Sequence, residues 1–117
     1  MPSVYLQNEG YRIVERNYRI RLGEIDIIAE QGGDLVFIEV KTRRHNIFGS
    51  PFESVTFQKQ KQLSKIALEY MTKRDCHSRS ARFDVVAIQL SCANKTAARG
   101  TVIEIIRNAF ELCYDND

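Results

Sequence analysis

Two short apolar runs, each interrupted by charged residues, form the clearest pattern in the sequence. Residues 23–29 read GEIDIIA and residues 35–41 read LVFIEVK. Runs this apolar are typical of buried strands, and a buried sheet tolerates charge only where the charge is paired, hydrated or bound to metal. Between them, residues 31–34 (QGGD) favour a tight hairpin turn. The pattern therefore predicts two antiparallel strands that carry charged side chains into a sheet.

Strand alternation brings candidate chemistry together on one face of the second run. Glu39 and Lys41 point the same way, roughly 6 to 7 Å apart, while Ile38 and Val40 point into the opposite layer. Asp26 in the first run comes within reach of Glu39 if the hairpin register permits, which the sequence leaves open. Two acids and a lysine can form a divalent-metal site beside a cation that polarises water or a phosphate. The other interpretation is an edge strand with solvated ion pairs, but residues 35–40 are too apolar for an edge.

The rest of the pattern predicts two helices and three further strands. Residues 4–9 read as the end of a helix closed by Gly10, and residues 11–18 as a strand. Residues 43–55 read as a loop. A helix capped by Thr56 follows, because apolar residues recur at three- and four-residue spacings. These apolar residues are Leu63, Ile66, Ala67, Tyr70 and Met71. The helix is followed by a strand at 83–90, a polar connection at 91–100, a strand at 101–106 and a short terminal segment at 108–114.

Composition fits one small globular domain spanning residues 1–117. The chain is 44% hydrophobic and 27% charged, has no apolar run of membrane-spanning length and begins without a secretory pattern. We therefore expect a cytoplasmic protein with no membrane partner. Three cysteines without a CxxC pair and only two histidines argue against a zinc cluster or a disulfide framework.

The charge is unevenly distributed along the chain. Residues 1–82 hold 14 Lys and Arg against 10 Asp and Glu, whereas residues 83–117 hold 3 against 5. The net charges are thus +4 and −2. A cationic N-terminal part makes nucleic acid a plausible partner, although scattered solvating lysines are the commoner cause of such an excess.

Six segments together resemble the bacterial YraN family of uncharacterised endonuclease-like proteins. They are GYRI at 10–13, RLGEIDIIA at 21–29, VFIEVKTR at 36–43, FGSP at 48–51, KQ at 59–60 and RFDVV at 82–86. The order of elements also resembles the PD-(D/E)XK nuclease superfamily, which includes restriction enzymes and Holliday-junction resolvases. The resemblance implies an α/β, restriction endonuclease-like αβββαβ core with a mixed central sheet flanked by helices.

The resemblance also implies roles for individual residues. The acids Asp26 and Glu39, with the main-chain carbonyl of Val40, would bind Mg²⁺ or Mn²⁺, and Lys41 would orient or activate the attacking water. The implied activity is hydrolysis of nucleic-acid phosphodiester bonds, with DNA the expected polymer, branched DNA a candidate substrate and a homodimer suggested by analogy with resolvases. Three auxiliary residues are proposed beside this site, namely Glu24, Lys59 and Gln60.

Several candidates have a plain structural alternative. Glu24 is either an acid supporting the site or the partner of Arg21 or Arg43, and Lys59 and Gln60 are equally an ordinary solvated helix start. Two further residues, Arg43 and Arg44, follow the strand with His45 and either contact phosphates or lie in a hydrated loop. Asp84 after Arg82 suggests a structural ion pair.

The N-terminus departs from the resemblance. Relatives begin with a longer first helix, which in resolvase-like members carries a glutamate that completes the metal site, whereas residues 4–9 match only the last turns of that helix. Glu9 lies too near Gly10 to replace it. The competing function is therefore a non-catalytic nucleic-acid-binding module that retains the nuclease fold. A weaker possibility is an interaction protein in which the charged cluster is a relic.

Overall fold

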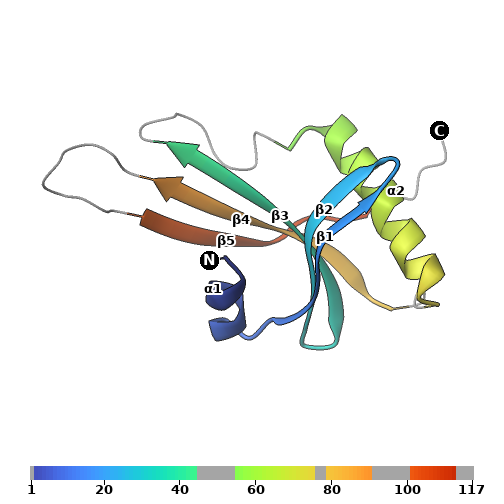
Figure 1. Ribbon diagram of the computed structural model, residues 1–117, viewed down its shortest axis with the longest axis horizontal. Helices are drawn as coiled ribbons and strands as arrows, with labels where there is room; N and C mark the ends of the chain where they lie inside the picture. The colour runs from blue at the N-terminus through green and yellow to red at the C-terminus, as the bar shows by residue number, and fades with distance from the viewer. Residues whose placement is uncertain (1, 45–54, 76–78, 91–100, 113–117) are drawn as a thin grey trace, which may run out of the picture.

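The computed structural model describes residues 2–44, 55–75, 79–90 and 101–112. Its strands form one five-stranded sheet in the order β1-β2-β3-β4-β5 (Figure 1). Neighbouring strands are antiparallel except β3 and β4, which are parallel because helix α2 connects them. This is the predicted α/β architecture with a mixed sheet. Its elements are α1 (Pro2–Asn8), β1 (Arg12–Ile20), β2 (Gly23–Gln31), β3 (Asp34–Arg44), α2 (Phe57–Lys73), β4 (Ala81–Leu90) and β5 (Thr101–Phe110).

Each face of the sheet has its own hydrophobic core. On one face Phe37 and Phe83 pack with the buried stripe of α2, and on the other Val36 and Ile38 pack with Leu6 of α1. The predicted stripe is confirmed, with Ser64 buried beside it. Its members are Leu63, Ile66, Ala67, Tyr70 and Met71.

The hairpin predicted between the two charged runs is confirmed. Gln31 pairs with Asp34, and the two glycines between them have positive φ angles, +59° and +91°. Positive φ at both central residues defines the turn that matches the twist of antiparallel strands, and glycine adopts it without strain. The register continues to Ile27 opposite Ile38. It fixes the relative positions of the charges farther along both strands.

The buried carboxylate of Asp84 joins several elements. Its side chain is fully buried and accepts hydrogen bonds from the Tyr11 hydroxyl at 2.7 Å, from Arg82 Nε at 2.9 Å and from the Asn108 backbone N–H at 2.8 Å. Burial, and next the bond to Asp84, raise the pKa of Tyr11 to about 12, so this hydroxyl remains a donor. The predicted pairing of Arg82 with Asp84 is therefore confirmed.

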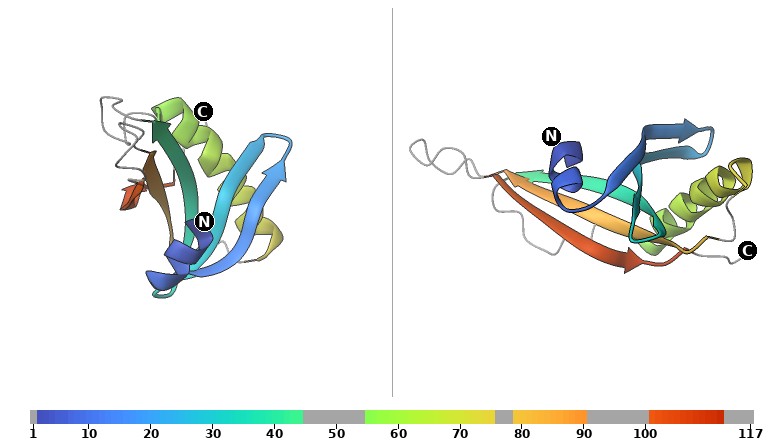
Figure 2. Two further views of the ribbon diagram at one scale, coloured as in Figure 1. Left: turned by 60° about the vertical axis from the view of Figure 1, so that its left-hand side comes forward. Right: turned by 90° about the horizontal axis from the view of Figure 1, so that it is seen from below.

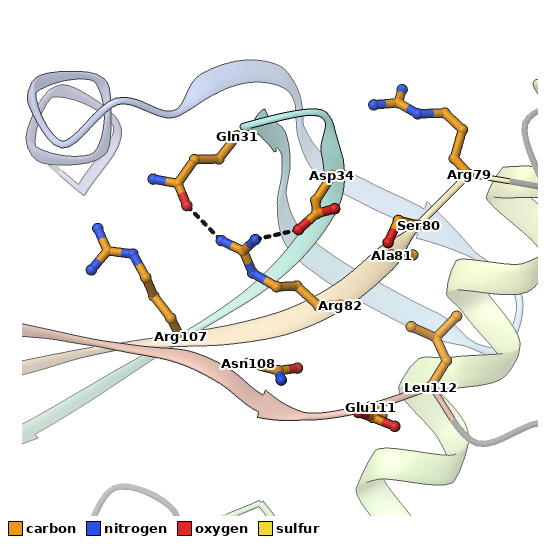
Figure 3. Close-up of a pocket in the computed structure, with 10 residues that line it drawn as sticks. All are labelled: Gln31, Asp34, Arg79, Ser80, Ala81, Arg82, Arg107, Asn108, Glu111 and Leu112. Atoms are coloured by element: carbon orange, nitrogen blue, oxygen red, sulfur yellow. Dashed lines mark hydrogen bonds and ion pairs between the residues drawn. The ribbon is translucent and has the colours of Figure 1, made fainter.

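Arg82 extends this network to the turn between β2 and β3. Its Nη1 lies 2.7 Å from Asp34 Oδ2 and its Nη2 lies 2.6 Å from Gln31 Oε1, both visible in Figure 3. Asn108 has a φ of +53° and lies at the bulge where the β4–β5 register shifts. Its N–H therefore donates to the Asp84 side chain instead of to a backbone carbonyl of β4. The network thus holds the hairpin turn, β4 and β5 in one arrangement.

Three predicted boundaries are wrong in detail. β1 continues to Ile20 and β5 to Phe110, so part of the expected terminal segment is strand. β3 continues to Arg44 rather than giving way to a loop at residue 43, because Arg43 and Arg44 pair in parallel with Gln89 and Leu90. The rest of the expected loop up to residue 54, which includes His45, lies outside the described residues, as do the connection at 91–100, His77 and all three cysteines.

We expect Asp84→Ala to lower the free energy of unfolding by about 3–5 kcal/mol, because it leaves the partly buried guanidinium of Arg82 without its main partner and removes the acceptor of the Tyr11 and Asn108 donors. Urea denaturation measures this. The control is Glu69→Ala, which breaks an exposed pair with Lys73 and should change stability by less than about 0.5 kcal/mol. Equal effects of the two substitutions would contradict a central role for Asp84.

Candidate metal and phosphate site

Strand β2 leaves β3 at Asp26. The register between them runs from the hairpin turn to Ile27 and Ile38, and beyond it the Val40 N–H donates to Asp26 Oδ2 at 2.8 Å. On β1, Arg16 pairs with Ile27, and the next residue, Asn17, adopts a φ of +52°. The irregular backbone of β1 thus lies beside the point where β2 and β3 separate. Figures 1 and 2 show the β1–β2 hairpin turning toward α2 while β3 continues beside β4 and β5. The Asp26 side chain thus accepts a hydrogen bond from the main chain of β3 at the point where β2 and β3 separate.

Glu39 lies beside this point and is surrounded by charge. It is 7% exposed, and its Oε2 lies 3.5 Å from Lys41 Nζ and 3.7 Å from Lys59 Nζ. β3 pairs with β2 only as far as Ile38, but the Glu39 side chain beyond that point is buried, so its charge is not part of the solvated pairs expected of an exposed edge strand. The predicted neighbourhood of Glu39, Lys41 and Asp26 is present, and Lys59 joins it from α2.

Asp26 lies close enough to Glu39 for its charge to disfavour ionisation of Glu39. Burial, and next the charge of Asp26, raise the pKa of Glu39, while Lys59 and Lys41 lower it. Burial also raises the pKa of Asp26, against the lowering effect of the Val40 N–H. Glu24 raises the pKa of Asp26 further by its own charge. In both acids burial is the largest effect, so the lysines offset only part of the penalty for ionising this pair.

Lys59 occupies a position that helix energetics do not favour. It lies in the first turn of α2, where no acidic residue is present and where the helix dipole disfavours cations. Thr56 caps the helix by accepting a bond from the Lys59 N–H at 3.1 Å. The nearby Glu39 carboxylate offsets the unfavourable interaction of the Lys59 ammonium with the helix dipole. Lys59 is therefore part of the charged cluster and not only a solvated residue at the start of the helix.

Other predicted auxiliary residues are placed differently. Gln60 donates to the Val55 carbonyl at 3.1 Å, so this bond directs its amide to the chain before α2. Among the described side chains Glu24 pairs with Arg19 at 3.1 Å rather than with Arg21, since Arg19 is its cross-strand neighbour on β1, and the side chain of Arg43 lies outside the described part of the chain. The spacing of Arg19 and Glu24 about the turn at residues 21–22 was the sequence signal for this pair.

The oxygen ligands at this site fit a hard divalent cation. Asp26 and Glu39 supply carboxylates, and the Val40 peptide adjoins them, because its N–H binds Asp26 and a strand residue directs its N–H and C=O toward the same neighbour. A bound cation would offset the cost of ionising these buried acids, whose pKa values are raised first by burial and then by like-charge repulsion. No group of three His, Cys, Asp or Glu side chains suited to a metal occurs within the described ranges. Mg²⁺ commonly uses one or two carboxylates and completes its shell with waters and substrate phosphates.

A cavity near the hairpin turn is a weaker candidate. It measures about 730 Å³ and three arginines line it (Figure 3). Each of them already lies beside a carboxylate: Arg79 beside Glu30 at 2.8 Å, Arg107 beside Glu9 at 3.7 Å, and Arg82 within the Asp84 network. The cavity therefore offers little uncompensated charge to a ligand.

The fold and the charged cluster define an α/β protein that gathers two acids and two lysines where β2 separates from β3. The chain belongs to the Uncharacterised protein family UPF0102, whose model matches residues 2–88. It is 48% identical over 114 residues to a UPF0102 protein of Syntrophus aciditrophicus, covering 97% of this chain and 85% of the relative. A UPF0102 protein of Moorella thermoacetica is 49% identical over 108 residues, covering 92% and 87%. The names of the family and of these relatives state neither an activity nor a superfamily.

Among solved structures, that of Pyrococcus furiosus SfsA in complex with Ca²⁺ aligns with a TM-score of 0.38 and 12% identity. The alignment covers 87% of this chain and 56% of SfsA, so this chain spans little more than half of that protein. Neither described helix is long and apolar enough to span a membrane.

We expect Asp26→Asn to stabilise the fold at pH 8. An acid whose pKa is raised on folding stabilises the native state below its unfolded pKa and loses that contribution as pH rises through the folded value. Asparagine keeps an oxygen for the Val40 N–H and removes the charge. Urea midpoints should be higher for the variant at pH 8, and the gain should shrink below about pH 4, where the carboxyl is protonated in both states. A variant less stable than the wild type at pH 8 would contradict this.

Proposed function

We propose that this protein is a metal-dependent nuclease that hydrolyses phosphodiester bonds of nucleic acid. The observation that carries the proposal is the arrangement around Glu39, where one carboxylate faces Asp26 and lies within 4 Å of two lysines. Burial and the charge of Asp26 keep the pKa of Glu39 raised although two lysines lie within 4 Å of its carboxylate. Such pairing of perturbed acids with cations is characteristic of functional sites.

The side chains can divide the work of hydrolysis. Asp26 and Glu39, with the Val40 carbonyl, would hold Mg²⁺ or Mn²⁺. The bound ion would make water more acidic and neutralise charge on the phosphate. Lys41, whose side chain is 24% exposed, can place an ammonium beside the attacking water or the phosphate oxygens, where charge develops in the transition state. Lys59, which is more exposed, is suited to contact a substrate phosphate.

Charge around the cluster supports a polyanionic substrate. Lys61 and Lys65 continue the basic character of α2 beyond Lys59, and Arg43 and Arg44 end the strand that carries Glu39. Phosphate contacts of this kind bind nucleic acid without reading its sequence. DNA is the proposed polymer, with branched DNA as a substrate to test. A homodimer is part of the proposal only by analogy with resolvases.

The first test of this proposal separates metal binding from cleavage. Lys41→Ala should retain Mn²⁺ binding and lose about 10²- to 10³-fold in cleavage rate, because it removes a cation used in the transition state. Asp26→Ala and Glu39→Ala should lose both. Calorimetric titration of Mn²⁺ and nicking of duplex, single-stranded and branched DNA provide the measurements.

Lys73→Ala is the matched control for Lys41→Ala. Its Nζ also lies 3.5 Å from a glutamate oxygen, but on the exposed end of α2. Full cleavage by all three site variants would overturn the mechanism. Salt-dependent binding of DNA without metal-dependent cleavage by the wild type would instead support the non-catalytic binding module.

Metal binding should also weaken on acidification sooner than at an exposed carboxylate pair. The ligands must be deprotonated to bind, and both pKa values are raised. We expect Mn²⁺ affinity to rise steeply with pH above the usual carboxylate range of about 4 and then to level off. Calorimetric titrations across pH 4 to 8 measure this, and an affinity already constant above pH 4 would contradict the raised pKa values.

A further inference from the structure

Phe57 is the first residue of α2 and its side chain is 63% exposed. Among the described aromatic residues, Phe37 and Phe83 are by contrast fully buried in the core. Sequence patterning does not single out Phe57, since it lies outside the apolar stripe of the helix. A lone exposed apolar residue is ordinary on a protein surface, so its importance depends on what surrounds it.

The ammonium of Lys61 lies beside the Phe57 ring. Lys61 Nζ lies 5.7 Å from the centre of its ring, one helical turn farther along. Lys61 also lines a cavity of about 340 Å³ between α2 and the β1–β2 turn. Within the described part of the chain, no carboxylate forms an ion pair with Lys61 or Lys65, so their charge is uncompensated there. The cavity is lined by Leu22, Gln58, Lys61, Gln62 and Lys65.

We infer that Phe57 stacks against an unpaired base of a nucleic-acid strand whose phosphates lie against Lys61 and Lys65. An exposed aromatic ring beside a basic groove is the combination that single-strand-binding proteins use, because every base has a face that stacks and every nucleotide has a charge. A purely apolar partner would leave both lysines unsatisfied. The inference rests on the nucleic-acid part of the proposed function and specifies that the substrate has unpaired bases.

The stacked base is not at the reacting nucleotide. Helical geometry puts Phe57 and Lys59 about 200° apart around α2, and a helix with side chains is about 10 Å across. Lys59 faces Glu39, while Phe57 faces the Lys61 side. A strand that meets both must therefore cross the start of α2. This requires a single-stranded segment beside the site, because bases within a duplex are already stacked on each other.

Phe57→Trp provides a direct probe, since the chain contains no tryptophan. Addition of an oligothymidine should quench its fluorescence, and an abasic strand of equal length and charge should not. Val4→Trp is the matched control, because Val4 is 56% exposed on α1, outside the site. Quenching of both tryptophans by both strands would show nonspecific association and overturn the stacking contact.

Affinity measurements test the same contact without a tryptophan. Phe57→Ala should bind a labelled single strand about 10-fold more weakly, Phe57→Tyr should bind it normally, and binding to blunt duplex should be unchanged in both. Equal thermal midpoints verify folding, which an exposed side chain should not affect. Unchanged single-strand affinity in Phe57→Ala would overturn the inference.

The outcomes also separate this inference from the proposed catalysis. Metal-dependent cleavage together with unchanged affinity in Phe57→Ala would retain the nuclease and overturn the stacking site. Base-dependent quenching without cleavage would support the stacking site and overturn catalysis. Self-association that Phe57→Ala abolishes, with no effect on strand binding, would show that a second copy of the chain covers the ring and would overturn the inference.

Discussion

The buried carboxylate of Asp84 is the interaction on which the remaining structure depends. Three donors from different segments meet it, and Arg82 carries the connection onward to the turn between β2 and β3. A buried charge is costly unless all its partners are in place, so a strand in the wrong register would be strongly penalised. The hydrophobic faces alone would tolerate more than one arrangement, whereas this network accepts only one. It lies on the α1 face of the sheet, and the charged cluster at Glu39 lies on the α2 face.

The two buried acidic sites therefore follow opposite rules. At Asp84 the carboxylate accepts hydrogen bonds from Tyr11, Arg82 and Asn108, and these bonds contribute to the specificity of the fold. At Asp26 and Glu39 the acids repel each other and burial raises the pKa of both. Proteins commonly retain such destabilising groups where function needs them. The Asp84 carboxylate is already occupied by protein donors. At Asp26 and Glu39, by contrast, a bound cation would lower the cost of ionising the two acids.

Much of this arrangement is predictable from local patterns, and the remainder depends on tertiary context. The hairpin glycines, the alternation that puts Glu39 beside Lys41 and the stripe of α2 follow from periodicity, because each repeats at short range. The extension of β3 to Arg44 does not, since a polar sequence became strand through pairing with β4. Nor does the full length of β5, which passes through a bulge at Asn108. The contact of Lys59 with Glu39 depends on how α2 packs against β3, which local sequence does not specify. The pair between Glu24 and Arg19 depends on the register that the β1–β2 turn sets.

The bond between Thr56 and Lys59 links the charge of the cluster to the integrity of one helix end. The cap oxygen accepts from the backbone of the same residue whose ammonium approaches Glu39. Helix ends are the parts of a helix that fray most readily, and a cap typically contributes about 1 kcal/mol against fraying. Each opening of this first turn would withdraw one of the two lysines and leave Glu39 more dependent on Lys41. Heating could thus alter the electrostatic balance of the cluster well below the temperature at which the sheet itself melts.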